Sequence, residues 1–157
     1  MTVHAPPDLH YLMEHQVWAR LDDDETATVG ITQLGIQLSG EVFMCRPRRV
    51  GTEVAQGGTV AVAELSKAIV AVKSPVTGVV VKINETLDEH PEQVHRDPYG
   101  AGWIARLRLT DFARDRTALV TGDAVAPAMQ EHAWSHRDEM VPATTPGLGR
   151  PAEGGIS

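Results

Sequence analysis

The chain has 157 residues, of which 42% are apolar and 22% are charged, and these values describe one folded domain. Its 14 Lys and Arg against 21 Asp and Glu give a formal net charge of −7, which argues against a protein that binds nucleic acid or anionic lipid by neutralising phosphates. No apolar run approaches the roughly 18 residues that span a bilayer. From the charge and from this absence, we expect neither nucleic acid nor a membrane among its partners.

The first residues and the single cysteine bear on the compartment. Acidic residues precede the first arginine, Arg20, so the start is neither a basic secretory leader nor an arginine-rich transit peptide. Cys45 has no second cysteine for an internal disulfide or a Cys-x-x-Cys pair. We therefore expect a cytoplasmic protein in which Cys45 packs as a small apolar side chain.

The composition changes near both ends of the chain. Residues 141–157 are dense in Pro and Gly and short of large apolar side chains, so they bury too little apolar surface to offset the conformational entropy lost on ordering. We expect a disordered tail there, a flexible N-terminus over residues 1–8, and one domain over residues 9–140.

Short strand-like runs occupy the first part of this domain. Residues 17–21 and 26–32 flank an acidic turn and predict a hairpin. Residues 33–38 have room for little more than one helical turn before Gly40, the expected cap. Residues 41–45 predict another strand.

Two strands in the middle of the chain are joined by a very short connection. Residues 59–63 and 69–73 alternate branched and small side chains, which favours extended backbone. Only residues 64–68 lie between them, so a tight hairpin turn is predicted. This turn lifts Lys67 to its tip, with the amine in water.

A third strand, over residues 79–84, follows the turn at residues 74–78. This turn and strand weakly echo residues 51–54 and the strand that follows them. Two similar halves around a hairpin predict a small, folded-over β-sandwich.

From residue 110 the pattern changes to helix. Asp111 is the expected N-cap of a helix over residues 112–119, and a second helix should end at Trp134. The fold is therefore predicted to be mainly β, with short helices and a C-terminal helical segment.

Two histidines on the second predicted helix have a spacing that metal ligands use. His132 and His136 are four residues apart, but no third ligand is evident near them. A solvated helix face is the preferred interpretation.

Several motifs resemble the glycine cleavage system H protein family, in order and with similar spacing. They cover residues 11–109: Val29–Thr32, the Glu64-x-x-Lys67-Ala68 turn, Ser74–Gly78, Asn84-Glu85, His90–Glu92 and Asp97-Pro-Tyr-Gly-x-Gly-Trp103. The resemblance implies a barrel-sandwich hybrid fold of the lipoyl/biotinyl type. It also implies a carrier protein without catalytic activity, in which Lys67 holds lipoic acid in amide linkage.

The surroundings of Lys67 fit a lipoyl group better than biotin. Biotinyl lysines are expected to have methionine on each side, whereas Ser66 and Ala68 flank Lys67. A lipoyl arm also supplies the dithiol that a chain with one cysteine lacks. We expect Glu64 to help a lipoate ligase or lipoyltransferase recognise the turn, and residues 97–103 to form a structural loop. A turn lysine is ordinarily only a solubilising charge, and the surrounding motif outweighs that interpretation.

Two departures from the family pattern leave the cargo open. Arg46, Arg48 and Arg49 stand where the family commonly has Leu-Pro-Glu, which indicates a basic patch that faces a partner. Leu65-Ser66 also replaces the common Ser-Val before the lysine. Both departures suit a lipoate-binding protein of the heterodisulfide-reductase-like sulfur oxidation system.

Three functions are therefore compared. The preferred one is transfer of an aminomethyl group from glycine decarboxylase to aminomethyltransferase, followed by reoxidation by dihydrolipoamide dehydrogenase. The second is carriage of sulfur for the heterodisulfide-reductase-like complex. The third is an interaction module that keeps the fold without a lipoyl group. The sequence leaves open the cargo, the modifying enzyme and the oligomeric state.

Overall fold

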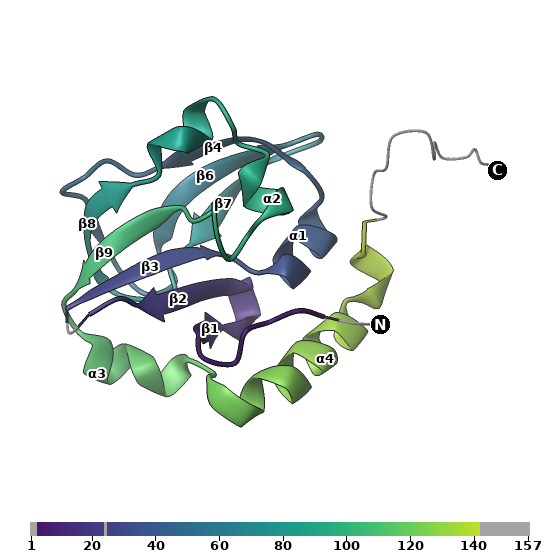
Figure 1. The fold of residues 1–157 in the computed structure, drawn as a ribbon. Helices are drawn as coiled ribbons and strands as arrows, with labels where there is room; N and C mark the ends of the chain where they lie inside the picture. The colour runs from purple at the N-terminus through teal and green to yellow at the C-terminus, as the bar shows by residue number, and fades with distance from the viewer. Residues whose placement is uncertain (1–2, 24, 142–157) are drawn as a thin grey trace.

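The computed structural model describes residues 3–23 and 25–141, which form two antiparallel sheets around a common core (Figure 1). The larger sheet has the strand order β1-β2-β3-β9-β8-β5, and the smaller sheet has the order β4-β6-β7. The strands are β1 His10–Leu12, β2 Val17–Leu21, β3 Thr26–Ile31, β4 Val42–Pro47, β5 Glu53–Val54, β6 Thr59–Leu65, β7 Ile69–Lys73, β8 Gly78–Ile83 and β9 Ala105–Leu109.

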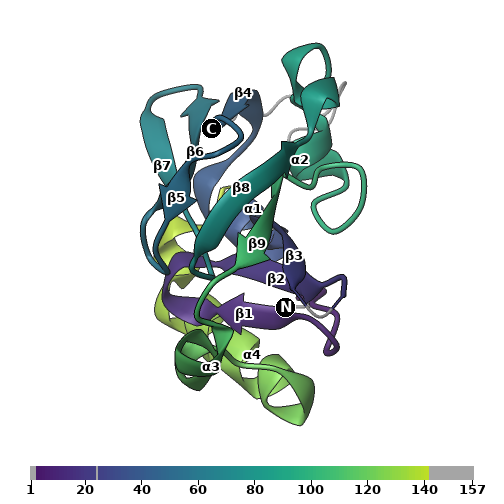
Figure 2. The same cartoon turned by 90° about the vertical axis from the view of Figure 1, so that its left-hand side faces the viewer.

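Short helices join the strands and extend the fold at its C-terminal end. Figure 2 shows α3 and α4 beside β1, on the side away from the smaller sheet. The α-helices are α1 Gln33–Ser39, α2 Gln93–Arg96, α3 Phe112–Asp115 and α4 Val125–Ser135, and the 3-10 helices are Met13–His15, Glu85–Asp88, Arg116–Ala118, Gly122–Ala124 and Arg137–Glu139. The mainly β fold with short helices and a C-terminal helical segment is confirmed. No helix among the described residues is both long enough and apolar enough to cross a membrane.

The main core lies between the two sheets. Buried valine, leucine and alanine side chains from both sheets form it, including Val29 and Leu107 of the larger sheet and Val60 and Val72 of the smaller one. Burying such apolar surface is the dominant favourable contribution to folding.

A second apolar cluster lies on the opposite face of the larger sheet. Because strand side chains alternate, Val17 and Ala19 enter the main core, whereas Trp18 between them packs with Met129 and Val125 of α4. The helix therefore covers an apolar stripe that would otherwise face water.

The two segments that echo each other in the sequence pair in space. β5 is antiparallel to β8, with Glu53 opposite Val79 and Val54 opposite Gly78. The N–H of Gly51 also donates to the carbonyl of Val80 over 2.7 Å. The repeat thus closes the larger sheet at one edge.

The helix after β9 differs from the prediction. The side chain of Asp111 makes no capping hydrogen bond, and α3 ends at Asp115, where a 3-10 turn continues the chain. Asp111 therefore takes the predicted N-cap position, but its side chain does not cap the helix, and α3 is shorter than the predicted 112–119. The backbone angles at Asp111, φ −158° and ψ 51°, place it outside the extended conformation that N-cap residues usually adopt.

Residues 3–8, which we expected to be loose, make defined contacts. The N–H of His4 donates to Oε1 of Gln33 over 2.8 Å, and the Tyr11 hydroxyl donates to the carbonyl of Pro6 over 2.6 Å. At the other end, Val141 donates its N–H to the carbonyl of Gln37, and the rest of the predicted tail, residues 142–157, lies outside the described residues.

Candidate functional site

Lys67 lies at the tip of the hairpin formed by β6 and β7. Glu64 pairs with Ile69, and the N–H of Leu65 donates to the carbonyl of Ala68 over 2.8 Å, so only Ser66 and Lys67 connect the strands. Ser66, Lys67 and Ala68 are all exposed. Within the described residues the Lys67 amine has no hydrogen bond and no ion pair, so it is free to react.

Glu64 lies on β6, three residues before Lys67. It is exposed and sits in register between Met44 of β4 and Ile69 of β7. No hydrogen bond or ion pair joins it to Lys67 across the described part of the chain. Its carboxylate is therefore available to another protein.

A cleft of about 660 Å³ opens beside the hairpin tip. Its walls come from the end of α1, the start of β4, residues 65–68, His95 of α2 and residues 140–141. Because the end of α1 runs directly into β4, four separate stretches of chain meet where Lys67 projects.

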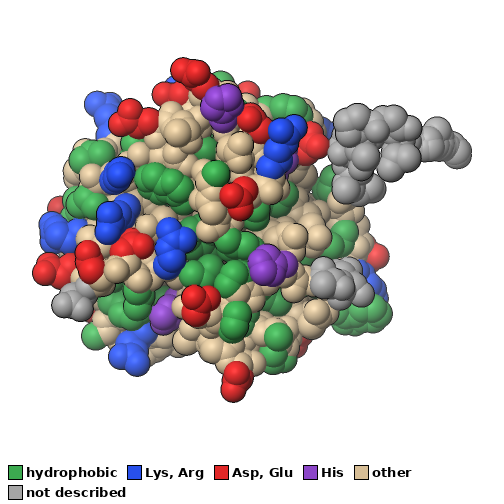
Figure 3. Space-filling view, in the orientation of Figure 1, with side chains coloured by type: hydrophobic (Ala, Val, Ile, Leu, Met, Phe, Trp, Pro, Cys, Tyr) green, Lys and Arg blue, Asp and Glu red, His purple; other side chains and the backbone are tan. Residues whose placement is uncertain are grey.

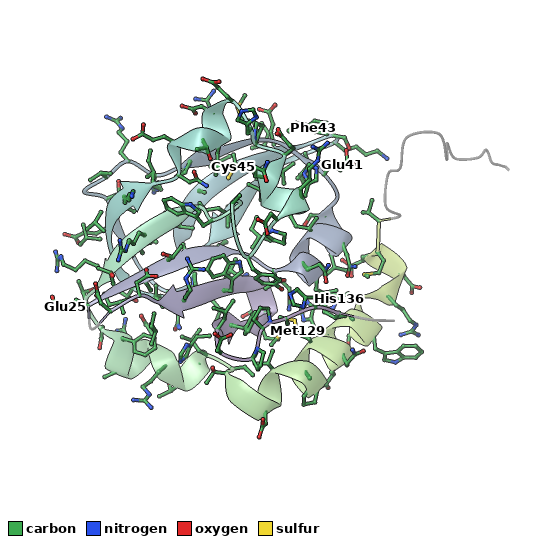
Figure 4. All side chains as sticks on the ribbon, viewed as in Figure 1. Glu25, Glu41, Phe43, Cys45, Met129 and His136 are labelled. Carbon is green, nitrogen blue, oxygen red and sulfur yellow. The ribbon has the colours of Figure 1, made fainter. Side chains whose placement is uncertain are left out.

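A β-bulge directs Phe43 to this cleft. Val42 pairs with Leu65 and Met44 with Glu64, so Phe43 is an extra residue without a partner on β6. Its side chain is 55% exposed and lines the cleft. Figure 4 shows Phe43 and Glu41 close together at the start of β4.

Apart from Lys67, the polar side chains that line the cleft are hydrogen-bond acceptors or neutral groups. Oε1 of Gln37 is buried and has no partner among the described residues, and the Glu41 carboxylate takes part in none of their ion pairs. His95 accepts the N–H of Val42 at Nδ1 over 2.9 Å, so its ring proton lies on Nε2. Burial lowers the pKa of His95, and the nearby Glu41 carboxylate offsets part of that shift.

The three arginines predicted to face a partner are exposed. Arg46 pairs through its backbone with Val62, and the N–H of Arg48 donates to the carbonyl of Val60, so both lie further from the hairpin tip than Glu64 does. Arg49 follows in the turn after β4. None of them lines the cleft.

Cys45 and the histidine pair have no chemical role in this site. Cys45 faces the main core at 1% exposure, and burial raises the pKa of its thiol to about 12. The rings of His132 and His136 stack with centroids 4.2 Å apart. No group of three or more His, Cys, Asp or Glu residues within 3–23 and 25–141 is arranged to hold a metal ion.

The loop at residues 97–103 holds backbone in place rather than lining the cleft. The Asn84 side-chain amide donates to the carbonyls of Ala101 and Trp103, and the Trp18 indole donates to that of Pro98 over 3.1 Å. These contacts agree with the structural role predicted for the loop.

Sequence reasoning located Lys67 but missed the cleft residues. Phe43 is placed by the bulge, and His95 reaches Val42 from 53 residues away in the sequence. Neither a bulge nor so distant a contact leaves a periodic pattern. The strands β1 and β9 were also missed: β1 has only three residues, but in β9 Arg106 and Arg108 alternate with apolar residues, a pattern that is typical of a half-buried strand and could have located it.

Comparisons with known proteins give a consistent result. The sequence model of the family described as "Glycine cleavage H-protein" matches residues 9–132. The chain is 38% identical over 127 residues to glycine cleavage system H protein 2 of Aquifex aeolicus, covering 81% of this chain and 79% of that one. It is 45% identical over 106 residues to the glycine cleavage system H protein of Marinobacter nauticus, covering 68% and 81% of the two chains. The crystal structure of a glycine cleavage system H protein from Mycobacterium marinum superimposes with a TM-score of 0.67 at 25% identity, covering 85% of this chain and 99% of that one.

Proposed function

The chain belongs to the glycine cleavage H-protein family, and we propose that Lys67 is the residue that carries its lipoic acid. H proteins are carrier subunits without catalytic activity that hold lipoic acid covalently on a lysine, and this chain is a lipoyl carrier of glycine cleavage. The observation that carries the assignment is the free amine of Lys67 at a two-residue hairpin connection beside a cleft.

The other two lysines of the chain are less suitable. The sequence contains only Lys67, Lys73 and Lys82. Lys73 is half-buried on β7, and Lys82 is exposed but lies within β8, opposite Arg106 of β9, rather than in a turn. A modifying enzyme must surround the lysine it acylates, and only Lys67 projects from a turn.

Glu64 supports the recognition of this lysine. It is exposed, unpaired among the described residues, and fixed on the strand that leads to the turn. We assign it to contact a lipoate ligase or lipoyltransferase. The family also implies glycine decarboxylase, aminomethyltransferase and dihydrolipoamide dehydrogenase as partners. We place the protein in the cytoplasm, because its relatives are bacterial H proteins and its cysteine is a buried free thiol.

The polar groups of the cleft favour an aminomethyl cargo over sulfur. Acylation removes the charge of Lys67, which is the only Lys or Arg among residues 3–23 and 25–141 that lines the cleft. The cleft then holds the Glu41 carboxylate, the unpartnered Oε1 of Gln37 and a neutral His95. The Glu41 and Gln37 oxygens attract the protonated amine of an aminomethylated arm and offer nothing comparable to a persulfide.

Intact mass and loading test the attachment site. The wild-type chain and Lys82→Arg, isolated from the native host, should each carry one lipoyl adduct, whereas Lys67→Arg should carry none. Added to glycine decarboxylase, only the first two should support decarboxylation of glycine. A full adduct on Lys67→Arg, or no stimulation by a fully lipoylated wild type, would contradict the assignment.

The loss of the loaded group to water tests the cargo. In Glu41→Gln the aminomethyl group should leave about tenfold faster, the equivalent of one charge-assisted hydrogen bond. Glu85→Gln, an exposed carboxylate outside the cleft, is the matched control. Equal release rates in all three proteins would remove Glu41 from the site.

A further inference from the structure

The smaller sheet has an outward surface that the fold leaves uncovered. Directly paired residues of neighbouring strands point to the same side of a sheet, and the side alternates along each strand. One outward row consists of Met44, Glu64 and Ile69, and the next consists of Arg46, Val62 and Ala71. The row between them, Cys45, Ala63 and Val70, turns toward the main core. We call the two outward rows the outer face.

The centre of the outer face is apolar. Ile69 is 68% exposed, Val62 42% and Met44 36%, and Ala71 is exposed beside them. Contiguous exposed apolar side chains with polar residues around them mark surfaces that bind other proteins. Lys67 follows this surface directly at the hairpin tip.

Basic side chains flank the outer face at the end far from Lys67. Arg46 lies on it, and Arg48 continues β4 in the same direction. Neither forms an ion pair with any described residue, and the same holds for Arg49 in the following turn. They form a basic end to the surface.

Three arginines elsewhere in the structure are paired, whereas Arg96, Arg108, Arg116 and Arg137 form no ion pair with a described residue. Arg20 and Arg106 both lie close to the Asp22 carboxylate, at 3.5 and 3.3 Å, and Arg114 lies 3.3 Å from that of Asp111. On the face of the molecule in Figure 3, basic and acidic side chains are interspersed. Arg46, Arg48 and Arg49 differ from the other unpaired arginines because they follow closely in sequence at the end of an exposed apolar surface, a combination that suits a partner with an acidic group.

We propose that the outer face docks an enzyme surface that is apolar at its centre and acidic where it meets Arg46 and Arg48. This proposal rests on the proposed function, because the enzyme is taken to be the glycine decarboxylase that loads the arm on Lys67. The basic end and the single carboxylate of Glu64 lie at opposite ends of the face, so the charge pattern also fixes the orientation of docking.

The dimensions of the face fit one interface. Arg46 is opposite Val62, three residues before the last residue of β6. At about 3.3 Å per residue, the arginine lies roughly 10 Å from the start of the hairpin connection. A standard interface of about 800 Å² on each partner covers both the basic end and the hairpin tip.

The test measures how efficiently the decarboxylase uses lipoylated variants of the carrier. The charge variant is Arg46→Ser with Arg48→Ser, and its matched control is Arg108→Ser with Arg116→Ser, two exposed arginines that also form no ion pair among the described residues. The apolar variant is Ile69→Ser, and its control is Val81→Ser, an exposed residue of β8. Circular dichroism confirms that each variant is folded, and intact mass confirms that each carries the lipoyl group.

We expect kcat/KM for the carrier to fall about tenfold in the charge variant at low salt, through slower association, and to approach the wild-type value in high salt. Ile69→Ser should lower kcat/KM at both salt concentrations, and the two controls should match the wild type.

Unchanged kcat/KM in both outer-face variants overturns the docking proposal while leaving Lys67 as the attachment site. A loss in Ile69→Ser alone overturns the acidic partner surface. A loss confined to the lipoylation step, with normal use by the decarboxylase, assigns the face to the modifying enzyme and overturns the proposal. A wild type that is never lipoylated overturns the proposed function, and the docking proposal with it.

Discussion

The hairpin tip at residues 66–67 and the loop at residues 97–103 are both short turns, and the fold treats them in opposite ways. One backbone hydrogen bond, from Leu65 to Ala68, closes the hairpin. In the loop, the Trp18 indole donates to the carbonyl of Pro98, and the Asn84 amide donates to the carbonyls of Ala101 and Trp103. The Gly102 N–H also donates to the carbonyl of Asp97 over 2.8 Å.

This difference in hydrogen bonding shows that a sequence motif can be needed for the fold or for exposure of a side chain. The loop residues are held because they join the two apolar clusters and the larger sheet, so their role is structural. The tip residues are held by almost nothing, which suits the proposal that Lys67 is the attachment site, because a lysine that other enzymes must reach cannot be packed. The predictions below test this division, from the largest expected loss of stability to the smallest.

Asn84→Leu should cost about 3 kcal/mol in the free energy of unfolding, because it removes a buried amide that donates to two carbonyls of the loop. The Asn84 amide donates to Ala101 and Trp103 over 2.9 and 2.7 Å, and its Oδ1 accepts the Thr86 hydroxyl over 2.6 Å. Urea denaturation measures the loss, with the neighbouring exposed Glu85→Gln as control. A change below about 1 kcal/mol would mean that the loop does not depend on these bonds.

Asp115→Asn should cost about 1–2 kcal/mol. The Asp115 side chain is fully buried, and it accepts both the N–H and the hydroxyl of Thr77, the latter over 3.0 Å. An amide can supply only one acceptor oxygen, so one of these donors loses its partner. The same denaturation measurement on Asp111→Asn, a half-buried carboxylate that caps nothing, should show a smaller change. An equal loss of unfolding free energy in both variants would mean that the contacts between Asp115 and Thr77 do not stabilise the fold.

Lys67→Ala should change the free energy of unfolding by less than about 0.5 kcal/mol, because a solvated turn contributes few buried contacts. The amide hydrogens of Ser66 and Lys67 should also exchange with solvent much faster than those of Ala101 and Gly102, as measured by NMR. Strong protection at the tip, or marked destabilisation by the substitution, would remove the contrast between the two turns.

The sequence was informative where the pattern is local. The alternation on either side of residues 64–68 predicted the hairpin, and the two-residue connection follows from it. The repeat around Gly51 and Gly78 predicted a two-layered fold, and these segments pair with each other. Both features depend on residues close in sequence or on a repeated motif.

The cleft could not be predicted, because its walls come from distant segments. His95 is placed by a bond to the backbone of Val42, and Phe43 by a slip in register between β4 and β6. The packing of Trp18 on α4 is likewise a contact between the first and last parts of the domain. Such contacts depend on the assembled sheets and leave no trace in spacing or hydropathy.

The inward position of Cys45 has a practical consequence for studying this carrier. Its thiol is buried and stays protonated at any pH used for labelling, so maleimides and iodoacetamide have no thiolate to attack in the folded chain. Any alkylation of the native protein therefore counts the sulfurs of the attached arm. Because the Cys45 thiol does not react, thiol titration of the folded protein reports the oxidation state of its prosthetic group directly.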